Sequence, residues 1–257
     1  MKAAILADTG NEDGSPGGAE FTMREFAMAA PDEVELVDVS EAEVVAIGNC
    51  RSYGRRLIPE LAGKRVVRYH HDFGRAEDPD LREWLEVHAE HIWTSPLHRR
   101  LAGQEGEVIP PPIDQEAFRP SRQTRRHGIR VGTCAIGSWH NPSKGQRLLL
   151  EWARKNEPVD VYGHGSDLWW PEPGQGVNVM GALDYSQVAQ TLWKYQRFIH
   201  LPTAPEPFGR GVVEAWAAGC DLVLNHLVGA LYFIQEAPEE LEGAADRFWE
   251  LLVGARV

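Results

Sequence analysis

Short apolar runs rich in β-branched residues alternate with longer amphipathic stretches along this chain of 257 residues. In the first half the pattern predicts strands at residues 3–7, 34–39, 44–48, 65–69 and 91–94 and helices at residues 19–29 and 79–89. Strands separated by helices favour a mostly parallel sheet with helices on both faces.

A proline segment interrupts this alternation. Residues 108–114 read Val-Ile-Pro-Pro-Pro-Ile-Asp. Because proline fixes φ and removes a backbone donor, neither a helix nor a central strand continues through it. A basic, polar stretch at residues 119–127 follows, and we place a domain boundary there.

The alternation then restarts. It predicts strands at residues 129–135, 159–162, 177–180, 198–201 and 222–224 and helices at residues 145–155, 185–195 and 209–218. A final amphipathic helix, residues 238–252, would bury one face formed by Leu241, Ala245, Phe248, Leu251 and Leu252. We therefore predict three segments, residues 1–121, 122–238 and 239–257. The first two would be Rossmann-like, doubly wound α/β domains facing a cleft, with ligands at the carboxyl ends of the strands.

Composition narrows the function classes. The formal net charge of −12 opposes binding to a polyanion, so nucleic acid is not an expected partner. No apolar run is long enough for a membrane span, and the apolar N-terminus is better explained as a first strand than as a signal peptide, so we expect a cytoplasmic protein. Cys50, Cys134 and Cys220 lie far apart without metal-ligand spacing, which predicts reduced, buried thiols.

Residues 206–219 carry the strongest functional signal: Glu-Pro-Phe-Gly-Arg-Gly-Val-Val-Glu-Ala-Trp-Ala-Ala-Gly. They lie between two predicted strands, which indicates a tight loop followed by a helix. The backbone N–H groups of Phe208, Gly209 and Arg210 would lie at the positive end of that helix, where a phosphate or a sugar oxygen can bind.

Two glutamates flank this turn. Glu206 would lie in the loop, where it could contact a sugar, and Glu214 in the helix, where it could bind ribose hydroxyls. The chemistry alone equally allows a structural explanation. Glu206 would then stabilise the N-terminus of the helix, and Glu214 would be a solvated side chain.

The whole segment resembles the signature of family 4 retaining glycosyltransferases, which have the GT-B fold. The matching residues are Glu206, Pro207, Phe208, Gly209, Glu214, Ala215, Ala217, Ala218 and Gly219. The resemblance implies transfer of a sugar from a nucleotide-diphosphate sugar to an acceptor with retention of anomeric configuration. It also implies front-side attack and a diphosphate held by protein groups, with no metal or other cofactor. It names neither the donor nor the acceptor.

Further segments follow the family's order. Gly17 and Gly18 resemble its N-terminal glycine-rich loop, and Lys144 resembles the lysine that binds the donor pyrophosphate. Gly229 resembles the glycine loop that follows the signature. The similarity is densest over residues 129–230.

The N-terminal half supplies a histidine pair at the end of a predicted strand. By its position, His71 or else His70 resembles the strand-end histidine that family members place near the reacting sugar. A neutral imidazole there could bind a sugar hydroxyl or position the acceptor. The structural alternative is a histidine that caps the strand end.

The chain also departs from the family. Ser138 takes the place of an arginine that commonly precedes the lysine, and the N-terminal half is short. Two alternatives therefore stay open: a degenerate protein that binds a nucleotide sugar without turnover, and a different enzyme on the same fold, such as a nucleotide-sugar epimerase or a sugar phosphorylase. Fold alone does not separate them.

Overall fold

The computed structural model describes residues 1–7, 18–48, 53–73, 78–121, 130–165 and 176–254. The chain forms two compact units. The first comprises Met1–Ile113 together with Gln235–Val257, and the second comprises Asp114–Ile234. The sequence-based boundary at residue 121 lies within the second unit, and the C-terminal segment folds with the first.

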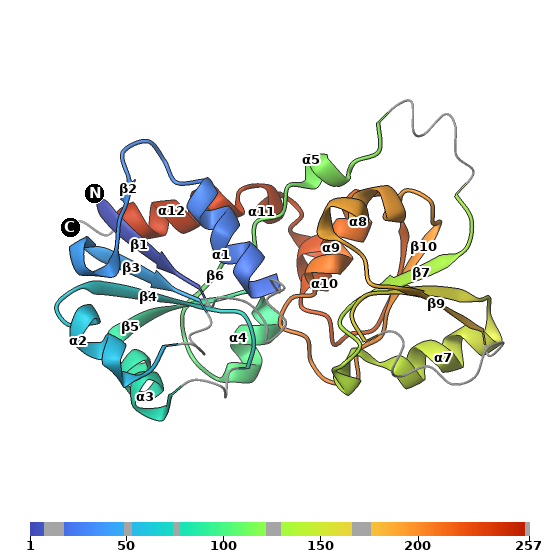
Figure 1. Ribbon diagram of the computed structural model, residues 1–257, viewed down its shortest axis with the longest axis horizontal. Helices are drawn as coiled ribbons and strands as arrows, with labels where there is room; N and C mark the ends of the chain where they lie inside the picture. Colours follow the sequence, from blue (N-terminus) through green and yellow to red (C-terminus); the bar gives the residue numbers. More distant parts are fainter. Residues whose placement is uncertain (8–17, 49–52, 74–77, 122–129, 166–175, 255–257) are drawn as a thin grey trace. The chain divides into compact units, whose positions relative to one another are not determined.

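A parallel sheet forms the centre of the first unit (Figure 1). Its strand order is β2-β1-β3-β4-β5-β6. The strands are β1 (Lys2–Leu6), β2 (Glu35–Leu36), β3 (Val44–Ile47), β4 (Arg65–His70), β5 (Ala89–Trp93) and β6 (Glu107–Val108). The helices are α1 (Gly18–Met28), α2 (Ile58–Leu61), α3 (Pro79–His88), α4 (Pro96–Ala102), α11 (Glu239–Glu242) and α12 (Ala244–Gly254).

The two faces of this sheet bury separate sets of side chains because successive strand residues point in opposite directions. In β3, Val44 and Ala46 pack in one cluster, and Val45 and Ile47 pack in the other. Helices α1 and α12 cover the first cluster, and α2 and α3 cover the second. The doubly wound arrangement predicted from the alternation is confirmed.

The C-terminal helix differs from the prediction in two ways. It is divided into α11 and α12 at Gly243, whose ψ of 11° departs from the helical value. Its fully buried side chains are Leu241, Ala244, Phe248, Trp249 and Leu252, whereas Ala245 and Leu251 are only partly buried.

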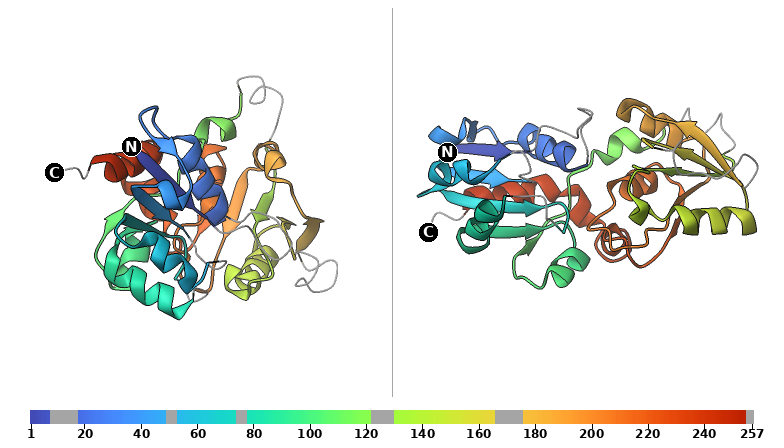
Figure 2. Two further views of the ribbon diagram at one scale, coloured as in Figure 1. Left: turned by 60° about the vertical axis from the view of Figure 1, so that its left-hand side comes forward. Right: turned by 60° about the horizontal axis from the view of Figure 1, so that its bottom comes forward.

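Helices α1 and α12 lie side by side on the sheet (Figure 2). The rings of Phe26 and Phe248 stack with centroids 3.8 Å apart, and Trp249 Nε1 donates to the Phe26 carbonyl over 2.8 Å. The last helix therefore completes the core of the first unit.

Phe248→Ala should destabilise this unit by about 3–5 kcal/mol, because it deletes a fully buried aromatic side chain and leaves a cavity. Urea denaturation measures the effect. Val87→Ala on α3, at a side chain that is 73% exposed, is the control and should stay within about 0.5 kcal/mol of the wild type. Equal effects of the two substitutions would contradict the packing role of α12.

The second unit contains a parallel sheet with the strand order β11-β10-β7-β8-β9. The strands are β7 (Thr133–Ile136), β8 (Val159–Tyr162), β9 (Val177–Gly181), β10 (Arg197–His200) and β11 (Asp221–Leu224). The helices are α5 (Gln115–Phe118), α7 (Gln146–Lys155), α8 (Tyr185–Leu192), α9 (Arg210–Ala217) and α10 (Ala230–Glu236), whose last residues belong to the first unit.

Helices cover both faces of this sheet as well. Ile199 of β10 packs in one cluster with Leu149 and Ala153 of α7. Its neighbour Phe198 points to the opposite face, toward Gly211 of α9. The second doubly wound domain predicted from the sequence is therefore also confirmed.

Candidate nucleotide-binding site

The strand order of the second unit reverses between β7 and β10. β8 and β9 follow β7 on one side, and β10 and β11 lie on the other. In open α/β sheets such a switch point leaves room for a ligand at the carboxyl ends of the two strands. The loop after β7 carries Lys144, and the loop after β10 carries Glu206, so the sequence motifs fall at the switch point.

Gly145 brings these two loops together. It has a left-handed φ of +84°, and a Cβ on it would lie 1.7 Å from the carbonyl oxygen of Leu201. Beside it, the Thr203 N–H donates to the Ser143 carbonyl over 2.8 Å. The 3₁₀ helix Pro142–Lys144 is thereby held directly against the loop after β10.

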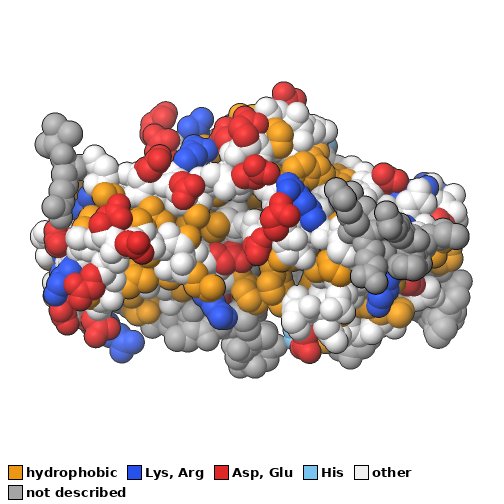
Figure 3. Space-filling view, turned by 90° about the horizontal axis from the view of Figure 1, so that it is seen from above, with side chains coloured by type: hydrophobic (Ala, Val, Ile, Leu, Met, Phe, Trp, Pro, Cys, Tyr) orange, Lys and Arg blue, Asp and Glu red, His pale blue; other side chains and the backbone are white. Residues whose placement is uncertain are grey.

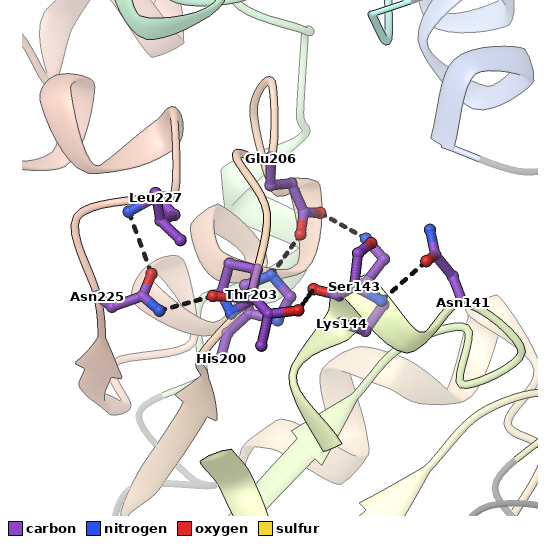
Figure 4. A network of polar contacts seen from close by, with 9 residues as sticks. Asn141, Ser143, Lys144, His200, Thr203, Glu206, Asn225 and Leu227 are labelled. Carbon is purple, nitrogen blue, oxygen red and sulfur yellow. Dashed lines mark hydrogen bonds and ion pairs between the residues drawn. The ribbon is translucent and has the colours of Figure 1, made fainter. Parts of the chain in front are cut away.

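Glu206 lies between two basic side chains (Figure 4). Lys144 Nζ donates to Glu206 Oε1 over 2.7 Å, and His200 Nε2 donates to Oε2 over 2.6 Å. Burial by itself would raise the pKa of Glu206, but the charge of His200 and of Lys144 outweighs it and holds the pKa well below its usual range. Glu206 is therefore an ionised carboxylate with both oxygens engaged.

The Lys144 side chain is 24% exposed. Its ammonium group has three N–H donors. Within the described parts of the chain Glu206 accepts one of them, so two can reach a ligand. An oriented ammonium at a strand end is a suitable partner for phosphate oxygens.

The loop after β11 fixes the backbone of Glu206. The Glu206 N–H donates to the Leu227 carbonyl over 2.8 Å, and the Gly229 N–H donates to the Glu206 carbonyl over 3.0 Å. Asn225 Nδ2 donates to the Pro202 carbonyl over 2.8 Å (Figure 4). Three loops, after β7, β10 and β11, thus converge on Glu206.

Gly209 leads from this loop into α9. It has a φ of +90° and is the N-cap of the helix. The Phe208 side chain is buried against Phe233, with ring centroids 5.9 Å apart, so only its backbone can reach a ligand. Among the described residues none accepts a hydrogen bond from the Phe208 or Gly209 N–H, in keeping with the predicted oxyanion-binding loop.

Glu214 lies in α9 and is only 5% exposed. Arg210 Nε donates to Glu214 Oε1 over 3.1 Å, and the Tyr185 hydroxyl donates to the same oxygen over 3.0 Å. Arg210 Nη2 also donates to the Tyr185 hydroxyl. The simple solvated glutamate that the sequence left open is wrong, and the Arg210 guanidinium is directed at Glu214.

The two candidate histidines of the first unit have different surroundings. The His70 ring is buried, stacks on Trp93 at 3.8 Å and shares a hydrogen bond with His91. Burial lowers its pKa, and nearby Arg68 lowers it further. His71 is partly exposed, and its Nε2 lies 3.1 Å from where a Cβ on Gly48 would be. His71 is the more exposed ring of the pair, but its Nε2 atom is buried.

The remaining glycine and Ser138 candidates are less informative. Gly18 is exposed as the first residue of α1, and its carbonyl accepts from the Thr22 hydroxyl. Gly17 lies outside the described residues. Ser138 is exposed beside Trp139, whose ring is buried and donates to the Tyr162 carbonyl.

A buried histidine next to this pair makes stability depend on pH. His98 is fully buried, with its ring nitrogens bonded to the Thr94 hydroxyl and the Asp72 carbonyl. Burial lowers its pKa to about 4. Because the unfolded chain takes up a proton near pH 6.5 and the folded chain does not, the free energy of unfolding falls as the pH drops below 6.5.

Between pH 7 and pH 5 the loss should be roughly 2 kcal/mol for each such buried histidine, and His70 should add to it. Urea denaturation at the two pH values measures the loss. His98→Gln should make the protein less sensitive to acid than the wild type. A stability that is flat between pH 7 and pH 5 would contradict the neutral, buried state of these rings.

Among the described residues, no group of three or more His, Cys, Asp or Glu side chains is arranged to hold a metal ion. The described helices include none that is both long and apolar enough to cross a membrane. Cys134 and Cys220 are buried free thiols whose pKa values are raised by burial, in the latter case to about 11. The described part of the face in Figure 3 carries scattered acidic side chains and no continuous basic patch.

Neither a protein-family model nor a curated protein matches this sequence. Solved structures do. HepE from Anabaena, in complex with UDP and glucose, superposes with a TM-score of 0.65 over 98% of this chain and 95% of its own, at 16% identity. AviGT4, a glycosyltransferase involved in avilamycin A biosynthesis, superposes with a TM-score of 0.66 over 98% and 92%, at 16% identity.

Sucrose-phosphate synthase from Thermosynechococcus elongatus superposes with a TM-score of 0.63 over 99% of this chain and 92% of its own, at 16% identity. These neighbours share the pair of parallel-sheet units described above. The chain has the GT-B fold. At such low identity the similarity establishes the fold alone, and within the GT-B fold the function has to be argued from the site.

Sequence reasoning missed two residues of this GT-B site. His200, which the sequence did not single out, binds the carboxylate of Glu206. Tyr185 was taken only as the start of a helix, but its hydroxyl binds Glu214. The position of His200 at the end of a strand, next to the glutamate loop, was the available signal for its role. No sequence pattern indicated the role of Tyr185.

Proposed function

We propose that this protein transfers a sugar from a nucleotide-diphosphate sugar to an acceptor with retention of anomeric configuration. The observation that supports the proposal is the contact of Lys144 with Glu206 at the switch point of the second unit. It joins the two motifs that resemble the donor-binding residues of family 4 glycosyltransferases.

In the proposed complex the donor diphosphate binds the Lys144 ammonium and the N–H groups of Phe208 and Gly209. The sugar contacts Glu206, and Glu214 binds the ribose. A cation and a helix N-terminus attract the negatively charged diphosphate, and carboxylates accept hydrogen bonds from sugar hydroxyls. His71 of the first unit would position the acceptor.

Charge grows on the diphosphate as its bond to the sugar breaks. Lys144 and the N-terminus of α9 would stabilise this charge, because both are positive and already oriented before the reaction. The leaving diphosphate would take the proton of the acceptor as the acceptor attacks from the same face. In this mechanism protein groups replace a metal ion, so turnover should persist in EDTA.

HepE was solved with UDP and glucose, which makes UDP-glucose the first donor to test. The purified protein is screened with UDP-, GDP- and ADP-sugars for thermal stabilisation and for release of free nucleotide, with and without EDTA. Glu214→Gln should weaken both responses. Glu151→Gln, at a surface glutamate paired only with Arg147 among the described contacts, is the matched control and should keep both.

The outcomes separate the alternatives. Release of nucleotide with an acceptor, and an α-linked product from an α-linked donor by NMR, support a retaining transferase. Binding without release under any condition points to a degenerate binding protein. Conversion of the donor sugar without an acceptor points to an epimerase. The absence of any response to all nucleotide sugars would overturn the proposal.

A further inference from the structure

We propose that the Tyr185 hydroxyl occupies the position of a ribose hydroxyl on Glu214 and is displaced when a nucleoside diphosphate binds. Tyr185 would thereby set the affinity of the second unit for ligands that carry a ribose diol. This inference rests on the proposed function, in which Glu214 binds the ribose.

The contacts of Glu214 show what a ligand would meet. Its Oε1 accepts from the Tyr185 hydroxyl over 3.0 Å and from Arg210 Nε over 3.1 Å. The Arg210 Nη2 group donates to the Tyr185 hydroxyl over 3.0 Å, which closes a triangle of three polar groups. The phenol oxygen therefore accepts from a cation and donates to a carboxylate, as a sugar hydroxyl can.

Burial indicates which group has to move. Glu214 is 5% exposed, so a ligand can reach its carboxylate only if a covering side chain gives way. The Arg210 side chain is 11% exposed and lies on the same helix, one turn before Glu214. Tyr185 is 37% exposed. Of these two neighbours, Tyr185 is the more exposed.

The position of Tyr185 also suits a movable side chain. It is the first residue of α8, so its backbone lies at a helix end and not within the sheet. Its ring meets the Phe118 ring edge-on, with centroids 6.3 Å apart, and the Arg210 guanidinium lies 5.8 Å from its centroid. Both contacts involve the face or edge of the ring at the protein surface, and neither is a hydrogen bond that would hold the hydroxyl on Glu214.

The test compares Tyr185→Phe with the wild type by calorimetric titration of UDP and of 2′,3′-dideoxy-UDP. Phenylalanine keeps the ring and removes the competing hydroxyl, so UDP should bind roughly five- to tenfold more tightly. Dideoxy-UDP lacks the diol and should bind both proteins equally. Tyr232→Phe, at an exposed tyrosine of α10, is the control and should change neither affinity.

A second variant shows whether the effect acts through Glu214. In a Glu214→Gln background, Tyr185→Phe should give no gain in UDP affinity. Unchanged or weaker UDP binding by Tyr185→Phe would overturn the inference and leave the proposed function intact, since Tyr185 would then merely position Glu214. A wild type that binds no nucleotide at all would overturn the proposed function, and the inference with it.

Discussion

Lys144→Met should lower the turnover of the donor by about 10²–10³-fold, because it removes a positive charge placed where the leaving diphosphate becomes negative. Methionine is unbranched and only one atom shorter than lysine, so we expect the loop to keep its backbone conformation. It also deprives Glu206 of one of its two partners, so the pKa of that carboxyl should rise. Turnover assays at saturating donor measure the first effect.

A loss of activity could also follow from a damaged fold, and a second variant separates the two. In Lys144→Met the ionised carboxylate of Glu206 keeps only His200 as a partner. The loss of the other partner should lower the stability of the fold. Adding Glu206→Gln removes that charge and should restore the stability without restoring turnover. Lys155→Met, at an exposed lysine of α7, should leave both unchanged. Normal turnover by Lys144→Met would contradict the role assigned to the ammonium.

Gly145→Ala should destabilise the second unit by about 4 kcal/mol or more, or prevent its folding, because the new methyl group meets backbone atoms. Its Cβ would lie 1.7 Å from the Leu201 carbonyl oxygen and 2.6 Å from the Leu201 carbonyl carbon. Relief requires the two site loops to separate, which would also pull Lys144 away from Glu206. Urea denaturation and donor binding measure the two consequences.

Gly132 provides the matched control. It lies in the same unit with a similar φ of +74°, but a Cβ on it would meet nothing within 4 Å. Gly132→Ala should therefore cost only the strain of a left-handed residue, about 1–2 kcal/mol. If Gly145→Ala cost no more than Gly132→Ala, the close approach of the two loops would be wrong.

The positions of the strands along the sequence were predictable because each buried strand is a short apolar run between turn residues. The core strands β3, β4, β8 and β10 begin and end within one or two residues of the predicted positions. The edge strand β2 is shorter than predicted, residues 35–36 instead of 34–39, because it pairs only with the start of β1. Hydrophobicity cannot show how far an edge strand finds a partner.

The candidate site was predictable where one sequence segment carries it. The loop and helix at 206–219 needed only local pattern and glycine positions. The partners of its two glutamates come from elsewhere: Lys144 from the loop after β7, and Tyr185 from α8. Their proximity depends on strand order and side-chain direction, which no local pattern records.

The most direct test of the central claim is a crystal structure of the protein with UDP. The proposed function predicts the diphosphate within hydrogen-bond distance of Lys144 Nζ and of the Phe208 and Gly209 N–H groups, with the ribose on Glu214. A diphosphate bound elsewhere, with these groups unchanged, would contradict it.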